Sequence, residues 1–135
     1  MAGYSGTPLS KKLGLKDGHT LLLLGAPKGF EKVLDPPAEV DVHERVDGGP
    51  FDVIVWFTKK RTELVSKLES VADGLEADGG LWVAWPKKAS GVKTDVTEEV
   101  IRNHALSLGL VDNKVCAIDH TWSGLRLVWR RELRS

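Results

Sequence analysis

The segment from Thr20 to Gly29 restricts the possible fold more than any other part of this chain. Its four consecutive leucines, Leu21 to Leu24, form an unbroken apolar run, which is typical of a central strand covered on both faces. The run leads into the turn Gly25-Ala26-Pro27-Lys28-Gly29, at the position where an α/β protein that binds a cofactor places its glycine-rich loop. The sequence therefore predicts a parallel sheet with this strand in its interior.

Length and charge limit the classes of protein that need to be considered. The chain has 135 residues, of which 41% are hydrophobic, and this is enough for one domain with a buried core. We expect a single domain over residues 1–135, with residues 1–15 as a short N-terminal helical extension. Its 19 basic and 19 acidic residues balance, so no overall field draws nucleic acid or an anionic membrane to the surface.

Two features indicate a cytoplasmic location. The purely apolar stretches are only a few residues long, so we expect neither a transmembrane helix nor a signal peptide. The single cysteine, Cys116, has no partner for an internal disulfide, which agrees with a reducing compartment. The histidines His19, His43 and His104 lack the spacing of metal ligands, and we predict no metal site.

The rest of the chain alternates between strand and helix patterns. Short β-rich or alternating segments predict strands at residues 39–46, 51–57, 81–85, 111–118 and 125–129, and apolar residues at helical spacing predict helices at residues 29–34, 62–75 and 96–108. The last two strands are too close together for a parallel crossover. We therefore predict an α/β fold with a doubly wound, mostly parallel sheet and a C-terminal antiparallel strand pair.

The expected boundaries of these elements rest on a few local signals. Asp78-Gly79-Gly80 is expected to form a turn before the strand at residues 81–85. Thr62 is the expected cap of the first long helix. For the second long helix, Asp95 and Glu98 have the spacing of a capping box, and Thr94 is a competing cap.

Several segments occur in the order found in class I methyltransferases and resemble the skeleton of that family. These segments are Leu15–Gly18, Leu21–Gly25, Phe51–Val55, Asp78–Val83 and Ala105–Leu110. The likeness covers most of the chain and implies an abbreviated, methyltransferase-like (Rossmann-like) domain. More narrowly, the opening Ala2–Leu9 and the block Gly80–Lys88 resemble a family of short bacterial proteins of unknown function. This second resemblance implies a fold but no activity.

The methyltransferase resemblance also implies S-adenosylmethionine as a cofactor, with Gly25, Gly29 and Glu44 lining an adenosyl pocket. The loop departs from the family's pattern, because Pro27 removes a backbone donor and Lys28 brings a cation toward a cofactor that is already cationic at sulfur. The chain after the second predicted strand is also too short for the usual third strand and its helix. We expect no cofactor, and the alternative is an S-adenosylmethionine-dependent methyltransferase with a divergent cofactor loop.

Basic residues follow the predicted strands at the edge where ligands collect in an open parallel sheet. The basic positions are Lys28, Lys59, Lys60, Lys87 and Lys88. Residues 59–61 directly precede a helix, whose dipole favours an anion at that end. Ser90 would add a donor, and Trp85 and Trp122 would add flat surfaces. These features predict a small anionic ligand, although solvated loops would explain the same lysines.

No catalytic motif stands out in the chain. Histidine side chains exchange protons near neutral pH, so His120 is a candidate general base at the ligand site. Its neighbours Asp119 and Ser123 lack the Gly-x-Ser-x-Gly elbow of a catalytic triad, and we assign no catalytic residue. Three functions remain open: a non-catalytic domain that binds a small anionic ligand or a protein partner, the methyltransferase described above, and a structural or adaptor subunit.

Overall fold

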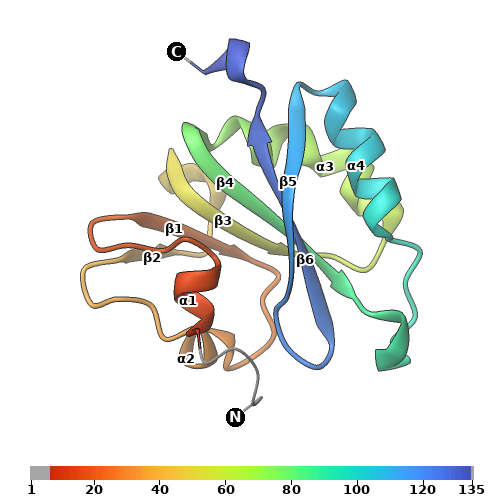
Figure 1. The fold of residues 1–135 in the computed structure, drawn as a ribbon, viewed down its shortest axis with the longest axis horizontal. Coiled ribbons are helices and arrows are strands. Elements are labelled where there is room, and N and C mark those ends of the chain that lie inside the picture. Colours follow the sequence, from red (N-terminus) through yellow and green to blue (C-terminus); the bar gives the residue numbers. More distant parts are fainter. Residues whose placement is uncertain (1–6, 135) are drawn as a thin grey trace.

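A six-stranded sheet forms the centre of the protein (Figure 1), and its strands follow the order β2-β1-β3-β4-β6-β5. The computed structural model describes residues 7–134. The strands are β1 (Thr20–Leu24), β2 (Asp41–His43), β3 (Phe51–Phe57), β4 (Leu75–Pro86), β5 (Leu110–Ala117) and β6 (Trp122–Trp129). Strands β2, β1, β3 and β4 are parallel, and β6 is antiparallel to both of its neighbours. The predicted mostly parallel sheet with an antiparallel C-terminal pair is confirmed.

Helices cover both faces of this sheet. Helices α1 (Leu9–Lys12) and α2 (Phe30–Leu34) pack on one face, and α3 (Arg61–Asp73) and α4 (Glu98–Ser107) pack on the other, which confirms the doubly wound arrangement. Three short 3-10 helices complete the described chain: η1 (Val46–Gly48), η2 (Lys88–Ser90) and η3 (Arg131–Leu133). Among residues 7–134, no helix has the length and apolar character that crossing a membrane requires.

The expected N-terminal extension is described only in part. Helix α1 lies within it, whereas residues 1–6, and with them most of the Ala2–Leu9 block, lie outside the described residues. The indole of Trp82 connects this extension to the sheet, because its Nε1 donates a hydrogen bond to the carbonyl oxygen of Leu13 at 3.0 Å. Leu13 and Leu15 are buried in the same apolar cluster as Trp82. A helix of four residues is not stable alone, so these contacts hold α1 in place.

Strand β1 is buried on both faces, as its run of leucines predicts. Leu21 and Leu23 belong to the cluster under α1 and α2, and Leu22 and Leu24 pack into the cluster under α3 and α4. Full burial of Leu21, Leu22 and Leu23 stabilises the fold by about 1.5–3 kcal/mol for each side chain, relative to an exposed one. Strand β2 forms the edge of the sheet beside β1 and is shorter than the predicted residues 39–46.

The predicted turn before β4 was wrong. Strand β4 begins at Leu75, directly after α3, and residues 78–80 lie inside the strand. A Cβ atom at Gly79 would lie 2.8 Å from the carbonyl oxygen of Asp52, so glycine lets β4 approach β3 closely. The register between these strands shifts between Phe51 and Val53. The glycine pair therefore marks an irregularity within the sheet, which is a common use of glycine in strands.

The predicted helix caps were also wrong. Helix α3 begins at Arg61, so Thr62 lies inside the helix. The N-cap of α4 is Thr97, whose hydroxyl accepts a hydrogen bond from the backbone N–H of Val100 at 3.2 Å. Asp95 and Thr94, the two expected caps of α4, bind instead to the segment that connects β3 to α3.

Candidate functional site

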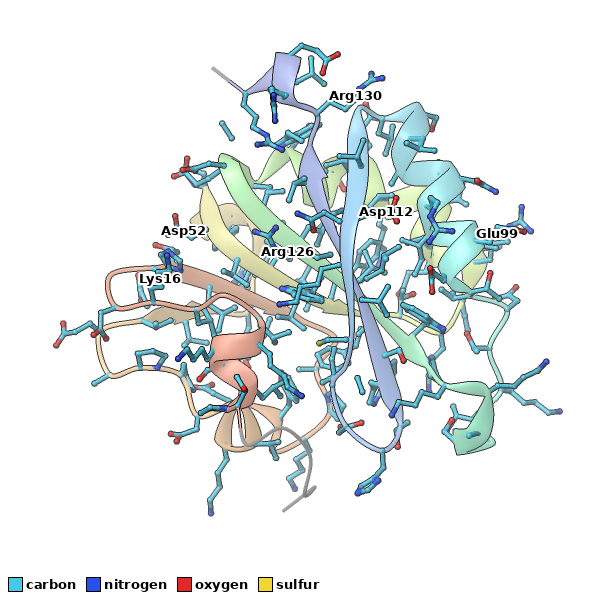
Figure 2. All side chains as sticks on the ribbon, viewed as in Figure 1. Lys16, Asp52, Glu99, Asp112, Arg126 and Arg130 are labelled. Carbon is cyan, nitrogen blue, oxygen red and sulfur yellow. The ribbon has the colours of Figure 1, made fainter. Side chains whose placement is uncertain are left out.

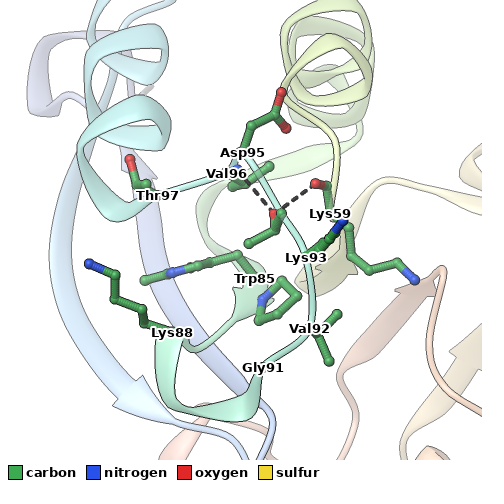
Figure 3. A pocket seen from close by; sticks show the side chains of 11 residues that line it. Lys59, Trp85, Lys88, Gly91, Val92, Lys93, Asp95, Val96 and Thr97 are labelled. Carbon is green, nitrogen blue, oxygen red and sulfur yellow. Dashed lines mark hydrogen bonds between the residues drawn. The ribbon is translucent and has the colours of Figure 1, made fainter.

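A hollow of about 760 Å³ lies at the carboxyl ends of β3 and β4 (Figure 3). Its walls come from Lys59 after β3, Trp85 and Pro86 at the end of β4, Lys88 of η2, and residues 91–97, which lead into α4. We call this hollow the Trp85 crevice. Ligands of open α/β sheets gather at this edge, because the strand ends leave their loops free to form a site.

The charge of the Trp85 crevice is mainly positive. Lys59, Lys88 and Lys93 line it, and all three are exposed. Figure 3 shows Lys88 beside the indole of Trp85 on one side, with Lys59 and Lys93 on the other. Asp95 supplies the single carboxylate among the described residues of the wall. A small anion in the crevice would therefore meet three ammonium groups.

Residues 91–97 are held against the β3–α3 connection by their own polar side chains. The hydroxyl of Thr94 donates to the carbonyl oxygen of Lys59 at 2.7 Å and accepts from the backbone N–H of Val96 at 3.0 Å. The carboxylate of Asp95 accepts from the backbone N–H of Arg61 at 2.7 Å. Val96 is buried under this loop. These contacts fix one wall of the crevice before any ligand binds.

The contact of Asp95 changes the expected role of residues 59–61. We predicted that the N-terminus of α3 would attract an external anion, and the structure places the protein's own carboxylate there. A carboxylate at this position satisfies a free N–H group and interacts favourably with the helix dipole. The positive charge of the crevice therefore comes from its lysines rather than from the end of α3.

Ser90 and Lys87 shape the turn beside the crevice and do not line it. The hydroxyl of Ser90 donates to the carbonyl oxygen of Lys87 at 2.6 Å and accepts from the backbone N–H of Val92 at 3.1 Å. The backbone N–H of Lys87 donates to the carbonyl oxygen of Thr121 at 2.7 Å. These bonds position η2, and Lys88 with it, at the mouth of the crevice.

The other predicted ligand residues do not line the crevice. Lys60 is the N-cap residue of α3, and Lys28 lies in the exposed turn after β1. His120 is exposed in the β5–β6 turn, where the carboxylate of Asp119 accepts from the backbone N–H groups of Thr121 and Trp122, both at 2.8 Å. The structure thus brings together Lys59, Trp85 and Lys88 of the predicted set.

Aromatic side chains pack over the ends of β1 and β3. The ring of Phe57 makes an edge contact with Phe30 at 4.8 Å between centroids and another with Trp122 at 5.0 Å. Trp122 is thus a packing residue of this cluster rather than a wall of the crevice. A Cβ atom at Gly25 would lie 2.8 Å from the carbonyl oxygen of Phe57, so the chain after β1 lies directly against the end of β3.

The remaining residues of the expected adenosyl pocket follow the ends of the neighbouring parallel strands β1 and β2. Gly29 is the N-cap residue of α2, with a φ of 84°, and Glu44 is exposed after β2. Within residues 7–134, no group of three or more His, Cys, Asp or Glu side chains is placed to hold a metal ion. Burial raises the pKa of the Cys116 thiol, with Lys12 and Lys114 acting in the opposite direction, which favours the unreactive protonated form.

Sequence reasoning missed the loop that forms half of the crevice. Lys93, Thr94, Asp95 and Thr97 all line it. The available signal was positional, because residues 91–97 follow a parallel strand and precede a helix and therefore lie at the carboxyl edge. The spacing of Thr94 and Asp95 before α4 indicates helix caps, whereas their contacts are with Lys59 and Arg61, more than 30 positions away.

Comparisons with known proteins extend the description of the fold. Residues 31–131 match a family described as "Protein of unknown function (DUF3052)". No curated protein matches the chain. The solved structure of ribosomal protein L11 methylase from Lactobacillus delbrueckii subsp. bulgaricus is similar, with a TM-score of 0.59 and 12% sequence identity over 91% of this chain and 76% of that chain.

A second similar structure is magnesium protoporphyrin IX methyltransferase from Synechocystis PCC 6803, solved with bound S-adenosylmethionine. Its TM-score is also 0.59, with 11% identity over 90% of this chain and 74% of that chain. At such low identity the likeness concerns the fold alone. The methyltransferase-like skeleton predicted from the sequence is confirmed.

Proposed function

The chain belongs to the DUF3052 family of proteins of unknown function, and from the geometry of its own site we propose that it binds a small anionic ligand in the Trp85 crevice. The observation that carries this proposal is the convergence of Lys59, Lys88 and Lys93 on one hollow beside an aromatic side chain. None of these three lysines forms an ion pair with any residue in the range 7–134. Their charges are therefore available to a ligand.

Trp85 favours a ligand that also carries a planar group. Its side chain is half-buried and packs against the apolar cluster under α3 and α4, while part of it lines the crevice. A fixed indole offers a flat apolar surface on which a ring can stack. The ligand class that fits is thus a phosphate or carboxylate joined to a planar ring, as in a nucleotide.

The polar groups of the crevice favour binding over catalysis. The polar side chains of the wall each bind backbone groups of the protein. Thr94 binds those of Lys59 and Val96. Asp95 binds that of Arg61, and Thr97 binds that of Val100. A nucleophile or general base must be directed at the substrate. Side chains that are committed to the loop and to two helix N-termini serve the structure of the wall instead.

Calorimetric titration with ATP, AMP and inorganic phosphate at two salt concentrations tests this function. The double variant Lys88→Gln/Lys93→Gln is expected to bind ATP about tenfold more weakly, because an exposed ion pair contributes up to about 1 kcal/mol. The control is Lys32→Gln/Lys67→Gln, which removes the same charge from exposed positions on α2 and α3. Equal affinities in the two double variants would remove Lys88 and Lys93 from the proposal.

Trp85→Leu separates the ring contact from the charges. Loss of stacking is expected to weaken binding of AMP severalfold while leaving that of inorganic phosphate unchanged. If none of the three ligands releases heat with the wild-type protein, the anion-binding function is wrong, and a protein partner becomes the occupant to seek at the crevice.

Methyl transfer from S-adenosylmethionine is the second candidate function, favoured by the similar methyltransferase solved with that cofactor. The residues after β1 do not fit the cofactor well. Phe57 lies against Gly25, Pro27 lacks an N–H group, and Lys28 is a cation near the place of a sulfonium ion. Titration with S-adenosylmethionine and S-adenosylhomocysteine decides between the two functions, because salt-tolerant micromolar binding of both would favour the methyltransferase.

A further inference from the structure

We propose that the protein has a second anion site, which takes one phosphate group in a recess between α1 and the β5–β6 pair. This basic recess has a volume of about 230 Å³, and its walls are residues 11–14, the strand residues Asn113 and Lys114, and Arg126 of β6. It lies apart from the Trp85 crevice and shares no wall residue with it. The proposal therefore does not depend on the proposed function.

Arg126 is the central residue of the basic recess. Its neighbours Leu125 and Leu127 pack under α3 and α4, so Arg126 projects to the opposite face, on which α1 lies. Figure 2 shows Arg126 over the middle of the sheet. A Cβ atom at Gly80 would lie 2.5 Å from the Nε atom of Arg126. The absence of a side chain at Gly80 therefore provides the space in which the guanidinium lies.

The guanidinium of Arg126 has no counter-charge among the residues that the structure describes. It is half-buried, yet no hydrogen bond or ion pair joins it to another side chain in residues 7–134. Burial lowers the pKa of Arg126, and the neighbouring charge that acts in the same direction is the cation Arg134. Charged groups that leave water are normally paired, so this arrangement stabilises the protein less than one with an anion beside Arg126.

Further cations surround the same recess. Lys114 is the register partner of Arg126 across the β5–β6 pair, and like charges directly opposite each other in a sheet are destabilising. Lys11 and Lys12 add two more cations from the last turn of α1. Lys12 and Lys114 both act on the Cys116 thiol, which indicates that the α1 and β5 ammonium groups approach one region. None of the described residues that line the recess is acidic.

The size and donors of the basic recess select the ligand class. A guanidinium presents parallel N–H groups that match two oxygens of a phosphate, and lysines add point charges around it. Asn113, at the irregularity where the β5–β6 register shifts, contributes an amide to the wall. Pockets for drug-sized molecules usually exceed about 300 Å³, so the recess fits one phosphate group rather than a whole nucleotide.

The test is a titration of the isotope-labelled protein with inorganic phosphate and, separately, with glycerol 3-phosphate, followed by the side-chain N–H signals in NMR spectra. We expect saturable shifts of the Arg126 Nε–H signal at both of two salt concentrations. Arg126→Gln should weaken phosphate binding about tenfold or more, because hydrogen bonds to charged groups are strong. Arg45→Gln, which removes the same charge from an exposed loop, should bind as the wild type does.

Lys114→Gln keeps the test decisive if Arg126→Gln fails to fold. Lys114 is exposed and lies opposite a like charge, so its replacement should leave the melting temperature unchanged or slightly higher and should weaken phosphate binding severalfold. Tighter binding of glycerol 3-phosphate than of inorganic phosphate would identify the source as a phosphorylated molecule, and the reverse would identify free phosphate. Absence of saturable shifts with both probes, or equal binding by the wild type, Arg126→Gln and Lys114→Gln, would overturn the proposal. A Lys88→Gln variant should bind phosphate at the basic recess as tightly as the wild type does. Failure of the basic recess can therefore be distinguished from failure of the Trp85 crevice.

Discussion

The carboxylate of Asp95 caps helix α3 from 34 positions away in the chain, through a 2.7 Å hydrogen bond from the backbone N–H of Arg61. The bond joins the β4–α4 loop to the β3–α3 connection, and residues of both segments line the Trp85 crevice. One side chain therefore has two effects. It stabilises the end of a helix, and it places the only negative charge among the described residues of the crevice wall.

Asp95→Ala and Asp95→Asn separate these two effects. Loss of the cap in Asp95→Ala is expected to lower the free energy of unfolding by about 1 kcal/mol, whereas asparagine is an equally good cap and should preserve it. Both variants remove the negative charge and should bind ATP severalfold more tightly. Urea unfolding and calorimetry measure the two quantities. A loss of stability in Asp95→Asn as large as that in Asp95→Ala would mean that charge, not the hydrogen bond, supports α3.

Gly80→Ala should disturb the basic recess without unfolding the protein. The new Cβ atom would meet the guanidinium of Arg126, which is the end of a flexible side chain and can move away. We expect phosphate binding to weaken severalfold, with a change in unfolding free energy of about 1 kcal/mol or less. Gly74→Ala is the matched control, because its new Cβ atom would lie 3.5 Å from the nearest atom, which is an ordinary van der Waals distance. Equal phosphate affinity in the two variants would argue against a role for Arg126.

Trp82→Phe should be among the most destabilising conservative substitutions in the sheet. It removes the N–H group bonded to the Leu13 carbonyl oxygen and leaves both an unsatisfied acceptor and a small cavity in a fully buried position. We expect a loss of about 2–3 kcal/mol in the free energy of unfolding. Trp129→Phe provides the comparison, since its bond to the Leu75 carbonyl oxygen is 3.5 Å long and its ring is half-buried. A smaller loss for Trp82→Phe than for Trp129→Phe would contradict this assignment.

Gly25→Ala tests the contact between the end of β1 and the end of β3. Gly25 has a φ of 64°, and its added methyl group would meet the backbone oxygen of Phe57, so strain and a backbone clash should together cost about 2–4 kcal/mol of stability. Gly14→Ala carries only the strain, with a φ of 84° and nothing within 4 Å of the new atom. Its expected cost is about 1 kcal/mol. Thermal unfolding of the pair measures the difference, and equal costs would show that β1 relaxes away from β3.

Cys116 is expected to make the protein slightly less stable as the pH becomes alkaline. Burial raises the pKa of its thiol, so the folded protein retains the proton at a pH where the unfolded chain has begun to lose it. The contribution to stability is complete below the unfolded pKa of about 8.5 and is lost as the pH rises through the folded pKa. Urea unfolding at neutral and alkaline pH should show a smaller decrease for Cys116→Ala than for the wild type. An identical decrease would assign the effect to other groups.

The predictable part of this fold is the part set by local apolar patterns. The leucines of β1 and the β-branched run of β3 indicate buried strands because both faces of each strand meet helices. The errors arose where a distant contact decides the outcome. The sequence around Gly79 indicates a turn, yet this glycine lets β4 approach Asp52 closely. Nothing in the neighbouring sequence predicts that contact.

The two proposed anion sites also differ in how far the sequence alone predicts them. Lys59, Trp85 and Lys88 follow parallel strands, so topology alone places them at one edge of the sheet. The position of Arg126 in the sequence gives no such indication, because it simply alternates with leucines within a strand. The surroundings of its guanidinium depend on Gly80 and Lys114, which lie on neighbouring strands. That this half-buried cation lacks a counter-charge within residues 7–134 can be recognised only once the pairing of the strands is known.

The position of β6 determines when the sheet can be completed during synthesis. β6 is the last strand in the described chain, but it lies between β4 and β5 and is hydrogen-bonded to both. Until residues 122–129 have left the ribosome, β5 has no strand to pair with, and the apolar face of α4 has only part of its partner surface. The nascent chain must therefore hold β5 and α4 in an unfinished state until almost all of the described sequence has been translated.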